Sequence, residues 1–209
     1  MPRPHSGSLP VRIGVVGAGA VLPQLIGGTL NDIRVSSDDV RLQGLVGDVR
    51  VHAQGVPIRG DAPIDQARAT VRLDEQQLRD LLGTVDGFPA DTVTLAAPNV
   101  AASTELSFLG LSVPIGLQLA PSAADGDVVL TPVSLSVAGN EVSADDLEDR
   151  FGALAGSVAR GYNVCIAQYL PAALTLTAIE VEGAEVVAHL DIDGAIGQNP
   201  ALHQNGTCR

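Results

Sequence analysis

The chain has 209 residues, of which 45% are apolar but only 2% aromatic, so Val, Leu, Ile and Ala must build its core. The 24 acidic residues outnumber the 12 basic residues, which are all arginine, and the net charge is −12. This charge, with no basic cluster in the sequence, disfavours nucleic acid and anionic membrane surfaces as partners. The sequence has no run of about 18 apolar residues and predicts no transmembrane helix.

The N-terminal segment has two interpretations. Residues 1–8 are polar and proline-rich, and we expect them to be disordered. Arg3 and Arg12 precede the apolar run Ile13–Leu22, and Ala18-x-Ala20 resembles a cleavage site, as in an export signal. The alternative, which we favour, is that this run belongs to one folded domain over residues 9–209. An export signal then lies upstream or has been removed.

A glycine-containing segment follows the first predicted strand. Val11–Val16 and Gly17-x-Gly19 are similar to the strand and glycine turn of a dinucleotide-binding fold. However, Leu22 occupies the third glycine position, Pro23 follows it, and the later segments alternate as strands rather than as βαβ units. We therefore expect no dinucleotide cofactor, and a short helix, Leu22–Ile26, that ends at a glycine pair.

The next segments alternate apolar and polar residues, which predicts strands with one buried face. The predicted strands are Leu30–Val35, Val40–Gly44, Val46–Ala53 and Ala67–Leu73, with a loop over Val56–Pro63. Charged residues occupy their solvent-facing positions: Asp32, Arg34, Arg41, Asp48, Arg50, Arg68 and Arg72. We expect them to form surface ion pairs across neighbouring strands, each of which contributes little to stability.

A helix is predicted over Asp74–Leu82, ending at Gly83. Asp74 and Gln77 have capping-box spacing, and the apolar face carries Leu78, Leu81 and Leu82. A second group of strands follows: Thr92–Ala96, Val100–Leu109, Leu111–Leu119, Asp127–Leu130 and Val133–Val137, with Pro121–Gly126 as a loop.

A longer helix is predicted from Ser143 to Gly161. Ser143 is its N-cap, and acidic residues in the first turns suit the helix dipole. Its apolar stripe has helical spacing and consists of Leu147, Phe151, Leu154 and Val158. Such a stripe is either ordinary core or a wall that faces a lipid.

The last third of the chain contains both cysteines, Cys165 and Cys208, and a predicted hairpin of Leu174–Val181 and Glu185–Ile192. In its first strand Leu174, Leu176 and Ala178 alternate, which predicts one buried face. A Cys165–Cys208 disulfide would close a loop of about 40 residues and contribute roughly 3–4 kcal/mol. Two unpaired buried thiols are the alternative, but the polar tail after Ile192 has little else to hold it.

Motifs for chemistry are weak. The chain has no G-x-S-x-G, and His5, His52, His189 and His203 belong to separate segments. The run Asp191-x-Asp193-Gly194 resembles the start of a calcium loop but lacks the later glutamate. We therefore predict no catalytic residue, no metal site and no cofactor.

Two stretches carry a family resemblance. The segments VCIAQYLPAALTLTAIEVEGAEVVAHLDIDG, before a closing NGTC, and LPQLIGGTLNDIRVSSDDVRLQG resemble the LmeA-like phospholipid-binding family of actinobacterial envelope proteins. The resemblance implies a non-enzymatic protein of the periplasm or cell envelope. Such a protein would bind phospholipid, touch membranes peripherally and support lipid or lipoglycan assembly. A structural or protein-interaction module of the envelope, without a lipid ligand, is the alternative.

The expected architecture is α+β, with long, curled antiparallel strands that wrap apolar helices. The resemblance implies a fold similar to tubular lipid-binding proteins, with an apolar groove. We expect this groove to be lined by Leu22, Leu25, Ile26, Phe108, Leu147, Phe151, Leu154 and Val158.

Overall fold

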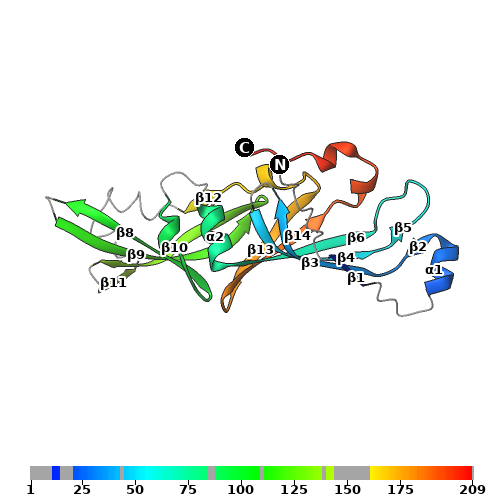
Figure 1. The fold of residues 1–209 in the computed structure, drawn as a ribbon. Coiled ribbons are helices and arrows are strands. Elements are labelled where there is room, and N and C mark those ends of the chain that lie inside the picture. The colour runs from blue at the N-terminus through cyan, green and yellow to red at the C-terminus, as the bar shows by residue number, and fades with distance from the viewer. Residues whose placement is uncertain are drawn as a thin grey trace, which may run out of the picture.

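The computed structural model of the protein describes residues 11–14, 21–42, 45–83, 88–108, 111–137, 140–143 and 161–208. Within these ranges the protein is mostly β, with a curled antiparallel half-barrel sheet and a few short helices (Figure 1). All strand pairs of the described residues are antiparallel. The expected curled antiparallel sheet is thus confirmed. Residues 1–8 and the predicted helix after Ser143 lie outside the described residues.

The first sheet has six strands in the spatial order β1-β3-β4-β6-β14-β13. Their bounds are β1 Val11–Gly14, β3 Ile33–Leu42, β4 Leu45–Gln54, β6 Gln66–Asp74, β13 Leu174–Glu182 and β14 Glu185–Ile192. Arg72 on β6 joins the C-terminal hairpin, because its Nη1 donates to Glu185 at 3.1 Å and Glu182 at 3.2 Å. The hydrogen bond to Glu185 has the largest effect on the pKa of Arg72, and together with the bond to Glu182 it holds this pKa above its ordinary value.

The second sheet has the order β11-β10-β9-β8-β7, and β12 also pairs with β10. Its strands are β7 Thr94–Ala96, β8 Asn99–Phe108, β9 Leu111–Ala124, β10 Asp127–Val137, β11 Asn140–Ser143 and β12 Tyr162–Val164. Figure 1 shows the two sheets lying end to end, with α2 (Glu75–Leu82) between them. The molecule is therefore elongated.

Short elements complete the described fold. The helix α1 (Val21–Gly27) lies with the two-stranded sheet of β2 (Thr29–Leu30) and β5 (Val56–Pro57) at the end opposite to β8 (Figure 1). The single-turn 3-10 helices are η1 Ala90–Thr92, η3 Ala167–Tyr169, η4 Gly194–Gly197 and η5 Pro200–His203.

The helix α2 begins with the predicted capping box. The Asp74 carboxylate accepts the Gln77 N–H at 2.8 Å, and the Gln77 side chain accepts the Asp74 N–H at 2.9 Å. The predicted apolar face is buried. On its other side, Arg79 donates to the Val93 carbonyl at 2.7 Å, and Glu75 accepts the Leu95 N–H at 3.1 Å. The helix therefore ties the first sheet to the edge of the second.

One aliphatic core joins the two sheets. The edge strand β13 of the first sheet packs against β9 of the second. Phe88 and Tyr162 contribute the one aromatic pair found among the described residues, with ring centroids 5.3 Å apart at an interplanar angle of 87°. The most deeply buried side chains are Leu82, Val93, Val100, Leu119, Leu135, Val186 and Val187.

The strand β3 is one bulged strand, whereas the sequence predicts two separate strands in this region. Its pairing with β4 shifts register between Ser37 and Val40. Asp39 has a φ of 54° there, and its N–H is satisfied by the Asp48 side chain at 3.0 Å. Aspartate tolerates this left-handed backbone better than most residues, so the chain bulges without ending the strand.

The predicted loop Pro121–Gly126 is also wrong, because β9 continues to Ala124. Asp125 and Gly126, at φ 53° and 85°, form a two-residue turn directly into β10. An Asp-Gly pair is the usual signal for such a turn. The strand β10 continues through Pro132, which has no N–H to donate, and its pairing with β9 shifts register directly after this residue. The two predicted strands Asp127–Leu130 and Val133–Val137 are therefore one strand.

Candidate functional site

One face of the first sheet is almost entirely aliphatic. Because side chains alternate between faces, the strand register aligns them in rows across β3, β4, β6 and β14. In that strand order, one row is Ile33, Ala53, Ala67 and Ile192. The next row is Val35, Val51, Ala69 and Leu190. The alanines are buried, whereas Val35 and Val51 are only half-buried. The face therefore offers a strip of aliphatic side chains that are incompletely covered.

Along the edge strand β13, the set of alternate residues that points to the aliphatic face changes at a bulge. Its pairing with β14 shifts register between Leu176 and Ala178, so Thr177 is an extra residue. Leu176 before the bulge and Val181 after it are buried, whereas Ala178 is exposed. The predicted regular alternation is therefore wrong beyond Thr177, because one inserted residue reverses the faces of all that follow.

The opposite, polar face of the first sheet is hollowed into a trough of about 940 Å³. Two polar rows line it, and the residues of the row between them, Val35, Val51, Ala69 and Leu190, also contribute to its lining. In order from β3 to β14, the first row is Arg34, His52, Arg68 and Asp191. The second row is Ser36, Arg50, Thr70 and His189. The bulge residue Thr177 adds a hydroxyl at one end.

Ion pairs hold some of the trough's charged groups. Arg68 Nε lies 3.4 Å from Asp191, and Arg34 Nε lies 3.6 Å from Asp32. His52 Nε2 lies 3.2 Å from Oδ2 of the same Asp32, but the two atoms are not oriented for a hydrogen bond. Within the described part of the chain Arg50 has no ion pair. Arg68 thus pairs across strands with Asp191, which is not among the charged residues for which the sequence predicts such pairs, whereas Arg34 pairs with Asp32 on its own segment.

His189 lies between a hydroxyl and a carboxylate. Its Nδ1 is 3.5 Å from Thr70 Oγ1, and its Nε2 is 3.5 Å from Glu180. This order resembles a hydrolytic triad, but both distances are at the limit of a hydrogen bond, and the His189 side chain is 43% exposed. The contacts orient the imidazole over the trough and give no sign of an activated nucleophile.

The second sheet carries a smaller hollow of about 320 Å³. It also lies on a polar face, where Gly116 leaves room beside Ser136. Hydroxyl and amide side chains line it, including Thr94, Ser103 and Gln118. This hollow contains one charged residue, Glu141, so its chemistry differs from that of the trough.

Exposed large apolar side chains gather at the end of the molecule that carries α1. Ile26 is 81% exposed, Leu25 43% and Ile58 39%. The Ile58 N–H donates to the Gly28 carbonyl at 3.0 Å, so the segment after β5 lies beside the end of α1. We call Leu25, Ile26 and Ile58 the apolar tip. Residues 21–31 carry no charge, and Arg59 follows Ile58 directly.

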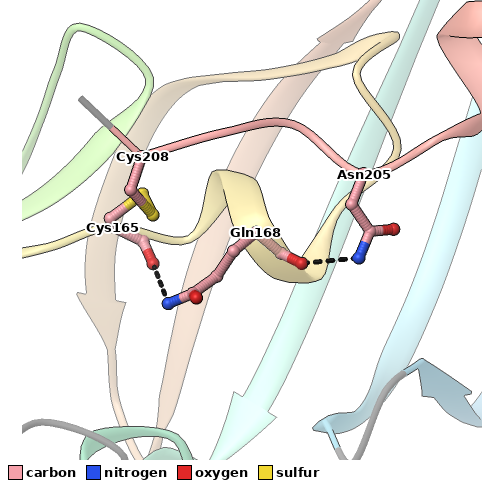
Figure 2. The surroundings of a disulfide bond; sticks show 4 residues. All are labelled: Cys165, Gln168, Asn205 and Cys208. Atoms are coloured by element: carbon pink, nitrogen blue, oxygen red, sulfur yellow. Dashed lines mark hydrogen bonds between the residues drawn. A yellow bond between two sulfur atoms is a disulfide. The ribbon is translucent and has the colours of Figure 1, made fainter.

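The predicted disulfide between Cys165 and Cys208 is confirmed, with an S–S distance of 2.05 Å (Figure 2). The tail has further anchors that the sequence did not reveal. Asn205 donates to the Gln168 carbonyl at 2.6 Å, and the Gly206 N–H donates to the Leu170 carbonyl at 3.0 Å. A disulfide indicates an oxidising, extracytoplasmic compartment.

The expected groove residues are described only in part. Leu147, Phe151, Leu154 and Val158 lie outside the described residues. Leu22, Leu25 and Ile26 belong to α1, whereas Phe108 is the last residue of β8, and Figure 1 shows these elements at opposite ends. The structure therefore does not bring α1 and Phe108 together, and a groove that included both would run the length of the molecule.

No group of three or more His, Cys, Asp or Glu among the described residues is placed to hold a metal ion. None of the helices in this part of the chain is long and apolar enough to cross a membrane. The trough arginines are what sequence reasoning missed. They appear in the sequence as isolated surface charges on three strands, and only the strand register brings them together.

The fold defines an antiparallel β protein whose larger sheet has one aliphatic and one polar face, with a disulfide that closes its C-terminal region. The chain belongs to the LmeA-like phospholipid-binding family, whose family model matches residues 12–191. No match was found among curated proteins or among solved structures.

Proposed function

We propose that this protein binds a phospholipid outside the cytoplasm, without catalysis, and holds the acyl chains against the aliphatic face of the first sheet. The observation that carries the proposal is the continuous aliphatic row Val35, Val51, Ala69, Leu190, whose first two members are only half-buried. Family membership and the disulfide support the ligand class and the compartment.

Aliphatic side chains suffice for this task. An acyl chain needs only apolar contact, and each buried CH₂ contributes about 0.8 kcal/mol. A lipid ligand also needs no activated nucleophile, in keeping with the long contacts around His189. We propose that the groove extends from this face to the residues expected from the sequence: Leu22, Leu25, Ile26, Phe108, Leu147, Phe151, Leu154 and Val158.

The apolar tip is the proposed point of contact with a membrane. Leu25, Ile26 and Ile58 would enter the bilayer interface, where burial of an Ile or Leu side chain is worth about 1.5–3 kcal/mol. The absence of acidic residues from 21–31 spares this end the repulsion that the net charge of −12 would otherwise cause. The protein would take up lipid there and support envelope lipid or lipoglycan assembly.

Native mass spectrometry of gently purified protein tests whether a lipid is bound. We expect an added mass equal to a phospholipid, which collision activation releases while the protein mass stays unchanged. Protein that never carries such a mass, even after incubation with phospholipid vesicles, would favour the alternative of a structural or protein-interaction module. A denatured sample of the same preparation is the control, because it keeps the disulfide but loses the fold.

A further inference from the structure

The polar trough on the first sheet brings three arginines together in a chain whose net charge is −12. We propose that it binds a phosphate ester, that is, a phosphate group attached to a hydroxyl-bearing polar molecule. The trough lies on the face opposite to the aliphatic rows of the same sheet. It is therefore a second site, apart from the proposed acyl-chain site, and goes beyond the proposed function.

Charge composition is the first argument. The residues that line the trough include three arginines, two histidines and a single acid, Asp191, in a chain whose net charge is −12. Asp32 and Glu180 contact lining residues from outside the lining. The net charge of −12 repels an anion from the protein as a whole, and three arginines on neighbouring strands oppose that repulsion locally.

Free hydrogen-bond donors are the second argument. Asp32 and Asp191 contact the Nε atoms of Arg34 and Arg68, and no contact within the described residues involves the terminal nitrogens of these two side chains. Arg50, on the strand between them, has no acidic partner there at all. A guanidinium presents paired N–H groups that match two phosphate oxygens, which makes Arg the preferred residue for phosphate.

Size and shape are the third argument. The trough crosses β3, β4, β6 and β14, and three strand spacings amount to about 14 Å, while its two rows lie about 7 Å apart. A volume of about 940 Å³ is more than a bare phosphate needs. Ser36 lines the trough beside Arg50, and its hydroxyl suits the polar group attached to the phosphate.

Two sources supply this chemistry: a phospholipid headgroup at a membrane surface, or a soluble phosphorylated sugar or polyol. Glycerol 3-phosphate, titrated into the full chain and followed by amide NMR shifts, probes the soluble source. Sedimentation with phosphatidylglycerol vesicles, compared with phosphatidylcholine vesicles, probes the membrane source.

The matched variants are Arg50→Gln and Arg41→Gln. Both arginines are exposed on neighbouring strands, but only Arg50 lines the trough. Arg50→Gln is expected to weaken binding of whichever probe binds by about tenfold, the worth of one charge-assisted hydrogen bond, and Arg41→Gln by less than twofold. The triple variant Arg34→Gln, Arg50→Gln, Arg68→Gln is expected to abolish binding. Added salt is expected to weaken it in the parent.

Each outcome decides the proposal. Saturable shifts with glycerol 3-phosphate that disappear in the triple variant support the soluble source. Vesicle binding alone, with the same dependence on the three arginines, supports the headgroup source. No binding of either probe, or equal losses in Arg41→Gln and Arg50→Gln, would overturn the proposal. The triple variant should retain any co-purified lipid mass, and loss of that mass would show that the two sites are not separate.

Discussion

The Cys165–Cys208 bridge shows how a single bond acts on a long segment. It spans 43 positions and encloses the whole β13–β14 hairpin, which completes the first sheet. Backbone hydrogen bonds such as Ala172 N–H to the Gln204 carbonyl, at 2.7 Å, hold the same tail independently. The bridge therefore acts mainly on the unfolded chain, whose freedom it reduces.

Replacing both cysteines with serine should lower the free energy of unfolding by about 2–4 kcal/mol while the fold persists. Denaturant unfolding followed by circular dichroism measures the change. Thr207→Ser, next to Cys208, is the matched control and should leave the midpoint unaltered. In the parent, alkylation under denaturing, non-reducing conditions should label neither cysteine. Full labelling, or an unchanged midpoint in the double variant, would contradict this account.

The role of the apolar tip depends on where α1 lies in the fold. The sequence predicts the helix Leu22–Ile26 as part of a groove wall, and the structure describes α1 over Val21–Gly27 with Leu25 and Ile26 exposed. A helix of this length is not stable alone, so β2 and β5 must hold it. The Gln24 side chain does so in part, because it accepts the Asn31 N–H at 3.1 Å.

Tryptophan reports directly on the tip, because the chain contains none. Ile26→Trp should shift its fluorescence to shorter wavelength and resist aqueous quenchers when phosphatidylcholine vesicles are added. Val133→Trp is the control, since Val133 is 44% exposed on β10 of the other sheet. Ile26→Ser should weaken vesicle partition by roughly 10- to 150-fold, from the loss of about 1.5–3 kcal/mol of transfer free energy. Equal spectral shifts for both tryptophans would contradict insertion by the tip.

Local signals were enough to predict several elements. The capping box of Asp74 and Gln77 and the hairpin of Leu174–Val181 with Glu185–Ile192 are short-range patterns, and the structure confirms both. The bulges at Asp39 and Thr177 could not be predicted, because an inserted residue is defined only by the partner strand. The trough was missed for the same reason: Arg34, Arg50 and Arg68 become neighbours through the pairing of β3, β4 and β6.

At the scale of the whole molecule, the first sheet separates two kinds of surface. Each strand contributes alternate residues to an aliphatic face and to a polar face, so neighbouring positions such as Arg50 and Val51 serve opposite sides. The second sheet and α2 cover one end of the aliphatic face with a common core. The central claim is that acyl chains occupy the part that this core leaves half-buried.

Photo-crosslinking with a phospholipid that carries a diazirine in its acyl chain tests this claim most directly, because alternate residues face opposite sides. After irradiation and digestion, mass spectrometry should locate adducts on the aliphatic positions of β3 and β4, chiefly Val35 and Val51. Unlabelled phospholipid in excess should suppress them. Adducts on the intervening polar-face residues Arg34 and Arg50, or no adduct that unlabelled lipid suppresses, would contradict the account.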